Sequence, residues 1–456
     1  MRDVRGLEMT TDAPAAVAAL DQAVAALLAH RADAGGHVQR ALQADPGLVA
    51  ARCLGGFGAL IQARGSLQDT ALTHLGAARA ALRQRGGTVR EAALVDALEA
   101  WAVQGDMPAA ATRLEALLRT DPLDALALKL AHAIRFMLGD APAMRLAVEA
   151  ALPAWDASVP GHGYILGCHA FALEETGEAA AAERIGRQAV AAAPDDLWGA
   201  HAVAHVLERA GRAGPGLDWI AELGPRIAAG GAFGRHIHWH AALFHLHLGQ
   251  AEAALALFDH HVAAAPSEEV RDFANAASLL WRLEAQGLPV GAARWAALAD
   301  VAARQAADPG LAFIDLHHVL ALGAAGRVAE LEAKLAAMRL RALAQTDTQA
   351  RLLAPLGLPA AQGIAAALRG DAAEAVALLL PLRPQMQRLG GSDAQRDLFE
   401  RILIQACLQA GQSALATLLL HDRVGQRARG AWEARLGPPL APPLAPPLAP
   451  RRALAA

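Results

Sequence analysis

A glycine followed by a polar residue recurs between alanine- and leucine-rich stretches, and this repeat constrains the fold more than any other feature of the sequence. From Gly105 to Gly249 the markers follow one another at steps of 34, 38, 34 and 38 residues. Steps of this length hold two helices with their loops, which is typical of helix-hairpin repeats. The whole series is Gly65-Ser66, Gly105-Asp106, Gly139-Asp140, Gly177-Glu178, Gly211-Arg212, Gly249-Gln250, Gly326-Arg327, Gly370-Asp371 and Gly411-Gln412.

Each glycine is expected to end a first helix in the left-handed conformation, after which the second helix runs back antiparallel. Four prolines follow the second helices, where a fixed φ and a missing amide stop the helix: Pro46, Pro122, Pro194 and Pro266. Each hairpin leaves an apolar face that only its neighbours can cover, so the core extends along the stack. The sequence therefore predicts an all-α fold, a single α-solenoid of helix-hairpin repeats over residues 1–436.

The composition agrees with helices throughout. Hydrophobic residues make up 54% of the chain but aromatic residues only 4%, because alanine and leucine dominate. Since period-two runs of β-branched residues are missing, the sheet-based nucleotide folds are disfavoured. After Arg435 the segment Gly437–Pro450 repeats Pro-Pro-Leu-Ala, which predicts a disordered tail over 437–456, with a ligand for a proline-reading domain as the alternative.

Charge and residue usage exclude several functions. The net charge of −4 and a single tyrosine, Tyr164, provide neither a basic patch nor stacking rings, so nucleic acid is not expected as a partner. Only two lysines occur, Lys129 and Lys334, which argues against a phosphate-loop lysine or a Schiff base. The stretch Gly55–Gly58 lacks the lysine that a phosphate loop needs, so no nucleotide cofactor is expected.

The cysteines and the N-terminal residues predict a cytoplasmic protein. Cys53, Cys168 and Cys407 are widely separated and form no CxxC pair, which favours a reducing compartment. The first eight residues carry acids where a secretion signal has its apolar core, and no long uncharged apolar span follows. A membrane is therefore not expected as a partner.

Histidines are concentrated in the centre of the chain, over residues 160–320. Of the 18 histidines, 11 lie between His162 and His261, and His317 with His318 extend the group. An α-helix turns by about 100° per residue, so the distance of a residue from its loop glycine gives the direction of its side chain around the helix. On this basis one set of polar residues falls within an arc of about 120° on the first helices. This set is His201, His205, Glu208, His236, His240, His247 and His317, whereas His169, His238, His245 and His318 fall outside it.

Two histidine pairs stand out within this arc. His201 and His205 are four residues apart, as are His236 and His240, so each pair projects from one face of its own helix. The pairs are offset by 35 residues, and packed neighbouring helices lie about 8–10 Å apart, so imidazoles from both can reach one ion. We expect a transition-metal site on these four histidines, with Glu208 and His317 as further ligands. Residues that surround these ligands or line the groove are expected at Glu175, Asp259, His261, Asp315 and Arg396.

Several sequence blocks resemble the tetratricopeptide repeat protein 38 family. The blocks are His201-Ala-Val-Ala-His205-Val-Leu-Glu208, His236-Ile-His-Trp239-His240, Phe258-Asp259-His260-His261 and Gly390-Gly391-Ser392-Asp393-Ala394-Gln395-Arg396-Asp397. The resemblance covers roughly residues 90 to 420. It implies tetratricopeptide-like repeats whose first helices line a concave groove, which is the face that carries the histidine arc. It transfers no catalytic assignment.

Nitrogen-rich ligands favour iron, zinc or manganese over calcium or magnesium. A redox-active metal would support oxygenase-like chemistry on a small molecule, and zinc would activate water for hydrolysis. The alternative is a non-catalytic scaffold that grips a peptide or a protein partner in the groove. A scaffold predicts a long open groove, whereas a metalloenzyme predicts closure by loops such as Ala213–Gly216 or Gly230–Gly234. Two further readings are hydrogen-bonded structural histidines and a pH-responsive binder.

Overall fold

The computed structural model describes residues 1–436 except Pro266 and residues 308–309. The described part is all-α: short loops join successive helices, and the one strand-like feature there is an isolated bridge between Arg2 and Glu8. The predicted all-α class is therefore confirmed. The proline-rich tail predicted for 437–456, and the proline marker at position 266, lie outside the described residues.

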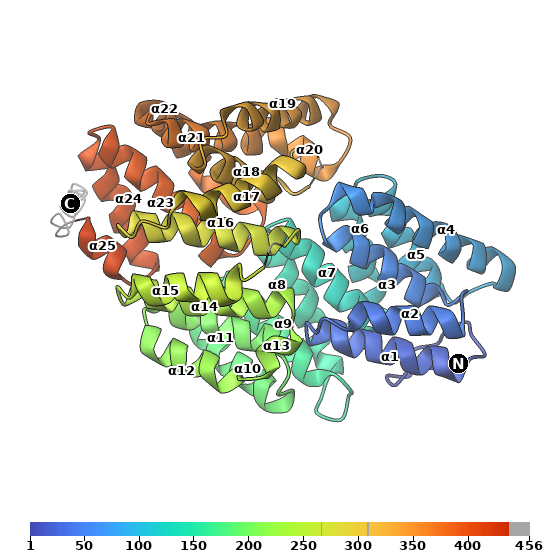
Figure 1. Cartoon of the computed structure of the whole chain (residues 1–456). Coiled ribbons are helices and arrows are strands. Elements are labelled where there is room, and N and C mark those ends of the chain that lie inside the picture. The colour runs from blue at the N-terminus through green and yellow to red at the C-terminus, as the bar shows by residue number, and fades with distance from the viewer. Residues whose placement is uncertain (266, 308–309, 437–456) are drawn as a thin grey trace, which may run out of the picture.

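The chain runs from blue to red through consecutive helices in Figure 1. The first half comprises α1 (Pro14–Leu28), α2 (Ala34–Ala44), α3 (Val49–Ile61), η1 (Gly65–Leu67), α4 (Gln68–Arg85), α5 (Val89–Ala102), α6 (Met107–Leu118), α7 (Ala125–Met137), α8 (Ala141–Ala151), η2 (Leu152–Ala154), α9 (His162–Glu175), α10 (Ala179–Ala192), α11 (Leu197–Arg209), α12 (Ala213–Leu223) and α13 (Arg226–Ala229). The second half comprises α14 (Ala232–His247), α15 (Ala251–Leu257), η3 (Phe258–Val262), α16 (Val270–Ala285), α17 (Ala292–Arg304), α18 (Ala312–Ala324), α19 (Val328–Ala344), α20 (Thr348–Leu352), η4 (Leu353–Gly357), α21 (Leu358–Arg369), α22 (Ala372–Leu379), η5 (Leu380–Leu389), α23 (Asp393–Gln409), α24 (Ser413–Gln426) and α25 (Ala431–Arg435).

The glycine markers form the turns that the sequence predicts, with one exception. All of them from Gly105 to Gly411 have a positive φ, as a left-handed helix end requires. At the first marker the left-handed residue is instead Ala63, with φ of 54°, and Gly65 begins the short helix η1. Gly287, with φ of 84°, ends α16 in the same way but lacks the polar residue that marks the others.

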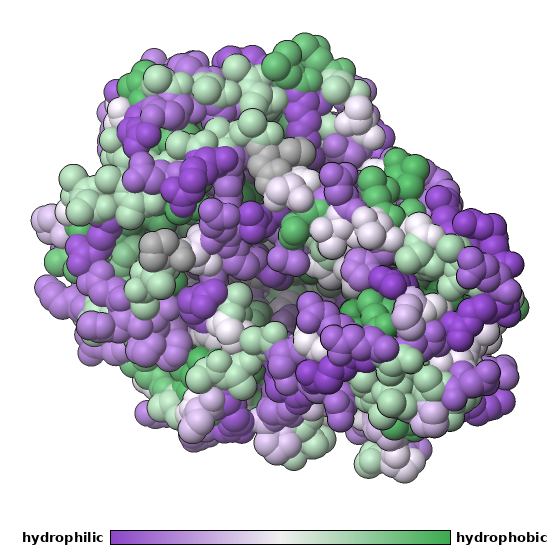
Figure 2. Space-filling model, turned by 45° about the vertical axis from the view of Figure 1, so that its right-hand side comes forward, coloured by the Kyte–Doolittle hydropathy of each residue, from purple (hydrophilic) through white to green (hydrophobic). Residues whose placement is uncertain are grey.

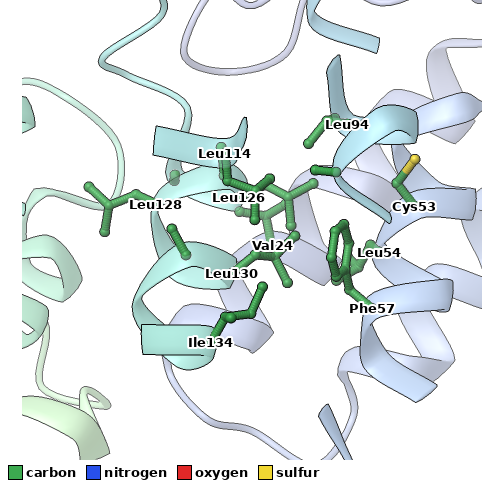
Figure 3. Packing of buried hydrophobic residues seen from close by; sticks show 14 of the residues in the cluster. Val24, Cys53, Leu54, Phe57, Leu94, Leu114, Leu126, Leu128, Leu130 and Ile134 are labelled. Carbon is green, nitrogen blue, oxygen red and sulfur yellow. The ribbon is translucent and has the colours of Figure 1, made fainter. Parts of the chain in front are cut away.

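Most helices pack against their neighbours in sequence, and many alternate helices also pack on one another. In the N-terminal third, Leu126, Leu130 and Ile134 of α7 point toward α1 and α3, where they meet Val24 and Phe57 (Figure 3). All five side chains are at most 3% exposed, so this face of α7 is covered on both sides. The small side chains of these helices allow the close approach, as the alanine-rich composition predicts.

The C-terminal helices return to the middle of the chain. In Figure 1 the red helices lie beside the green and yellow ones, and α23 and α25 contact α16 and α14 respectively. The Gly105 carbonyl accepts hydrogen bonds from Thr348, and a Cβ placed on Gly139 would lie 1.7 Å from the Gln387 carbonyl oxygen. The C-terminal part therefore covers a face of the central helices that an open superhelix would leave exposed.

One helical stretch, Thr348–Arg369, is long and apolar enough to cross a membrane by length and composition, and 56% of its most apolar window is buried inside the structure. It joins α20, η4 and α21, which pack against α18 and α19. On the face shown in Figure 2, hydrophobic residues are interspersed with hydrophilic ones rather than gathered in a continuous belt. The three cysteines are buried and unpaired.

Candidate metal centre

Two consecutive first helices bring four imidazoles to one point. His201 and His205 lie on α11, His236 and His240 lie on α14, and these two helices pack directly against each other. One ring nitrogen from each histidine lies within 4.8 Å of all the others. The side chains are between 0% and 8% exposed, so the cluster is closed to solvent. The four-residue spacing and the 35-residue offset predicted this meeting of two pairs.

The separations between the ring nitrogens suit a shared ion. The Nε2 atoms of His201 and His205 are 2.9 Å apart, those of His201 and His236 are 2.9 Å apart, and those of His236 and His240 are 3.2 Å apart. A zinc–nitrogen bond is about 2.0–2.1 Å long, so two ligands at 90–110° around one ion lie about 2.9–3.4 Å apart. The four Nε2 atoms therefore already stand at the spacing of neighbouring ligands.

The Nδ1 atom of His205 donates to a carboxylate that the sequence analysis missed. It lies 3.0 Å from Glu174 Oε2 and 3.9 Å from Glu175 Oε1, and both acids are buried at the end of α9. A carboxylate that accepts from the distal nitrogen of an imidazole is the usual outer partner of a metal-binding histidine. Burial lowers the pKa of His205, but the charge and hydrogen bond of Glu174, together with the charges of Glu175 and Glu208, outweigh burial and raise it.

The other three rings are held neutral. Burial is the main cause that lowers the pKa of His201 and of His240 well below the ordinary value, and it lowers the pKa of His236 to about 3. Neutral imidazoles are the form that binds metals. Burial thus disfavours the charged form of three of the four rings, and only His205, beside Glu174, has a raised pKa.

His236 has an outer partner of a different kind. The amide nitrogen of Asn275, on α16, lies 3.0 Å from His236 Nδ1. The oxygen of Asn275 accepts in turn from the side-chain nitrogen of Gln395, at 3.1 Å. Gln395 belongs to α23, so the returning C-terminal helix reaches the histidine cluster through Asn275.

Aromatic side chains enclose the cluster on the α11 side. Phe171 stacks on His201 with ring centroids 5.4 Å apart, and Phe233 lies edge-on to the same ring at 5.2 Å. Trp198 packs against His201 at 5.2 Å, and its indole nitrogen donates to His132. Phe233 comes from the stretch Gly230–Gly234, whereas Ala213–Gly216 starts helix α12. Of the two loops expected to close the site, Gly230–Gly234 therefore contributes a wall through Phe233. In place of Ala213–Gly216, it is α23 that reaches the surroundings of the cluster.

The structure does not bring the two further predicted ligands to the cluster. Glu208 forms an ion pair with Arg427 from the C-terminal segment and is not part of the converging group. His317 lies on α18, and its Nδ1 donates to the carbonyl of Phe313 at 2.8 Å, while Phe399 covers the ring. Helix α16 lies between α14 and α18. His317 therefore shares the helix face of the cluster histidines but does not meet them in space.

The five predicted outer residues divide in the same way. Glu175 borders His205 and pairs with Arg396 at 3.3 Å, so both of these belong to the surroundings of the cluster. Asp259 pairs with Arg294 at the surface, and His261 stacks on His238, outside the cluster. Asp315 is buried against Lys334 at 2.6 Å, which accounts for its charge without a metal.

The partners that sequence reasoning missed are Glu174 and Asn275. Glu174 lies about one helical turn before the loop glycine Gly177, so its position on the helix could have predicted it. No motif, however, distinguishes it from the adjacent Glu175. Gln395 belongs to the Gly390–Asp397 block of the resemblance, and the structure makes it part of a capping box with Ser392 at the start of α23. No protein-family model matches this chain.

Proposed function

We propose that this protein binds a transition metal at the buried cluster formed by His201, His205, His236 and His240. The observation that carries the proposal is the convergence of four Nε2 atoms, from two helices, at separations of 2.9–3.2 Å between successive rings. Four imidazoles buried side by side lose hydration, which a bound ion offsets. Nitrogen ligands favour zinc or iron, with manganese third, over calcium and magnesium.

The pattern of outer partners supports a metal more than a purely structural cluster. Two of the rings have an outer partner at Nδ1, Glu174 for His205 and Asn275 for His236. All four Nε2 atoms face one another instead of facing backbone oxygens. The Glu174–His205 pair adds the carboxylate–imidazole arrangement that raises the basicity of a ligand.

We propose that the chain is a tetratricopeptide-like α-solenoid related to the tetratricopeptide repeat protein 38 family. The left-handed glycines and the packing of alternate helices support the repeats, and the resemblance of the histidine blocks supports the relationship. The alternative of a peptide-binding scaffold is weaker at the histidine face, because α23 and α25 pack on α16 and α14 there. A small-molecule metalloenzyme fits a closed, aromatic-walled centre better.

Metal content tests the proposal directly. The full chain is purified without a nickel column and its metals are measured by elemental analysis, beside the double variant His205→Ala, His240→Ala. The matched control, His238→Ala with His261→Ala, removes two stacked imidazoles outside the cluster. We expect about one metal per chain in the wild type and the control and almost none in the cluster variant. Absence of stoichiometric metal from the wild type after incubation with zinc, iron and manganese would overturn the proposal.

A further inference from the structure

The inner face of the histidine cluster is not chemically uniform, because a fixed donor sets the tautomer of His236 and a fixed acceptor sets that of His205. For His236, a series of hydrogen bonds sets the tautomer, and the series starts at a backbone amide. The amide N–H of Ser392 can only donate, and it points at Gln395 Oε1 at 3.0 Å, so the other end of that side chain must be its NH2 group. This NH2 group faces Asn275 at 3.1 Å.

The same reasoning continues inward. Because Gln395 donates to Asn275, the atom of Asn275 that faces it is the carbonyl oxygen, and the amide NH2 faces His236 Nδ1 at 3.0 Å. Nδ1 of His236 is then an acceptor. In a neutral imidazole the proton must therefore sit on Nε2, which is the atom that points into the cluster.

His205 is fixed in the opposite sense. Glu174 accepts from its Nδ1, so a neutral His205 presents a lone pair at Nε2. Among the described residues no group outside the cluster fixes the tautomer of His201 or His240, because their Nδ1 atoms have no partner. These two rings are free to present lone pairs to an ion, whereas His236 presents a proton.

We infer that the Ser392–Gln395–Asn275 chain makes His236 a hydrogen-bond donor to the fourth ligand of the metal, with His201, His205 and His240 as the three protein ligands. This inference rests on the proposed metal centre. Three protein ligands with an exchangeable fourth position are typical of catalytic zinc, whereas four protein ligands are typical of structural zinc. The fourth ligand is of the class that accepts a hydrogen bond while it binds the ion: hydroxide from water, or an anionic oxygen of a substrate. Gln395 and Asn275 act as positioning residues.

Two substitutions reverse the tautomer without removing any imidazole. In Gln395→Glu the carboxylate accepts from Ser392 and from the NH2 group of Asn275, so the Asn275 oxygen turns to accept from His236 Nδ1–H. Asn275→Asp places an acceptor directly against Nδ1. The matched control is Gln409→Glu, which adds the same charge to an exposed position of α23.

The first measurement needs no metal. Two-bond proton–nitrogen correlation spectra of the metal-free full chain, labelled with nitrogen-15 in histidine, report which ring nitrogen carries the proton. His236→Gln assigns the signals. We expect the His236 proton on Nε2 in the wild type and in Gln409→Glu, and on Nδ1 in Gln395→Glu and Asn275→Asp. A His236 proton on Nδ1 in the wild type, or no change in both Gln395→Glu and Asn275→Asp, overturns the inference.

The second measurement uses the cobalt-loaded protein, with azide as the probe for an exchangeable ligand. We expect azide to change the visible spectrum of the wild type and of Gln409→Glu, and to bind at least about tenfold more weakly to Gln395→Glu, where His236 becomes a fourth nitrogen ligand. Equal azide binding by the three proteins overturns the assignment of the fourth position. If the two variants switch tautomer as expected but the wild type binds no cobalt, zinc or iron, the proposed function is refuted and the hydrogen-bond chain still stands. The two failures are therefore distinguishable.

Discussion

Asp397→Asn is expected to destabilise the docking of the C-terminal helices strongly. Asp397 lies on α23, and its side chain is 5% exposed. Arg423 donates to both carboxylate oxygens, at 2.6 and 3.0 Å, and Arg401 donates at 2.7 Å. Arg282 of α16 stands 4.0 Å away. The substitution replaces an acceptor oxygen by an NH2 group that faces guanidinium donors, so at least one buried charge loses its counter-ion.

The expected cost follows from burial rather than from the number of ion pairs. Removing one partner of a buried pair costs about 3–5 kcal/mol, whereas an exposed pair contributes at most about 1 kcal/mol. The matched control is Asp300→Asn, because Asp300 pairs with Arg327 at 2.8 Å but both side chains are at least 36% exposed. Since domains are stable by only about 5–15 kcal/mol, the difference between the two variants is large.

Urea denaturation followed by circular dichroism measures both variants, and hydrogen exchange locates the change. We expect a clearly lower urea midpoint for Asp397→Asn and a midpoint near that of the wild type for Asp300→Asn. The loss of amide protection should concentrate in α23 and α24. Equal midpoints for the two variants, or a loss of protection confined to the N-terminal helices, would refute the reasoning from burial.

Three further outcomes are expected. Glu174→Gln should weaken metal binding about 10–100-fold in a chelator competition, because it removes the negative charge beside His205 Nδ1–H. An affinity equal to that of Glu178→Gln would count against this role. In the metal-free protein, burial lowers the pKa of His236 to about 3 and of His317 to about 4. As the pH falls, these two histidines therefore bind protons at a higher pH in the unfolded chain than in the folded protein. Stability should therefore fall as pH drops below 6.5, by about 1.4 kcal/mol per pH unit for each of these histidines, and a urea midpoint equal at pH 6.5 and 5 would exclude this. Gly139→Ala should lower the melting temperature more than Gly177→Ala. Both glycines have a positive φ, but only at Gly139 would the new Cβ meet the Gln387 backbone. Equal shifts of the melting temperature would argue against that contact.

Much of the local structure could be predicted because its causes are local. The glycines at 105, 139, 177, 211 and 249 end helices for want of a Cβ, and the aspartates at 106 and 140 cap the helices that follow. The two histidine pairs meet because helical periodicity and repeat length are both legible in one dimension. Ala63 replaced the expected glycine at the first turn, since a left-handed residue at a helix end tolerates a side chain at modest cost.

The sequence by itself determined the helices, their order and the face that carries His201, His205, His236 and His240, because these follow from residue preferences and from spacing along the chain. Only the tertiary structure decided which polar residues reach that face. The return of α23 places Gln395 beside Asn275 and Arg427 beside Glu208, although about 120 and 220 residues separate these partners. Contacts between distant segments depend on how the whole stack curves, which no local pattern records.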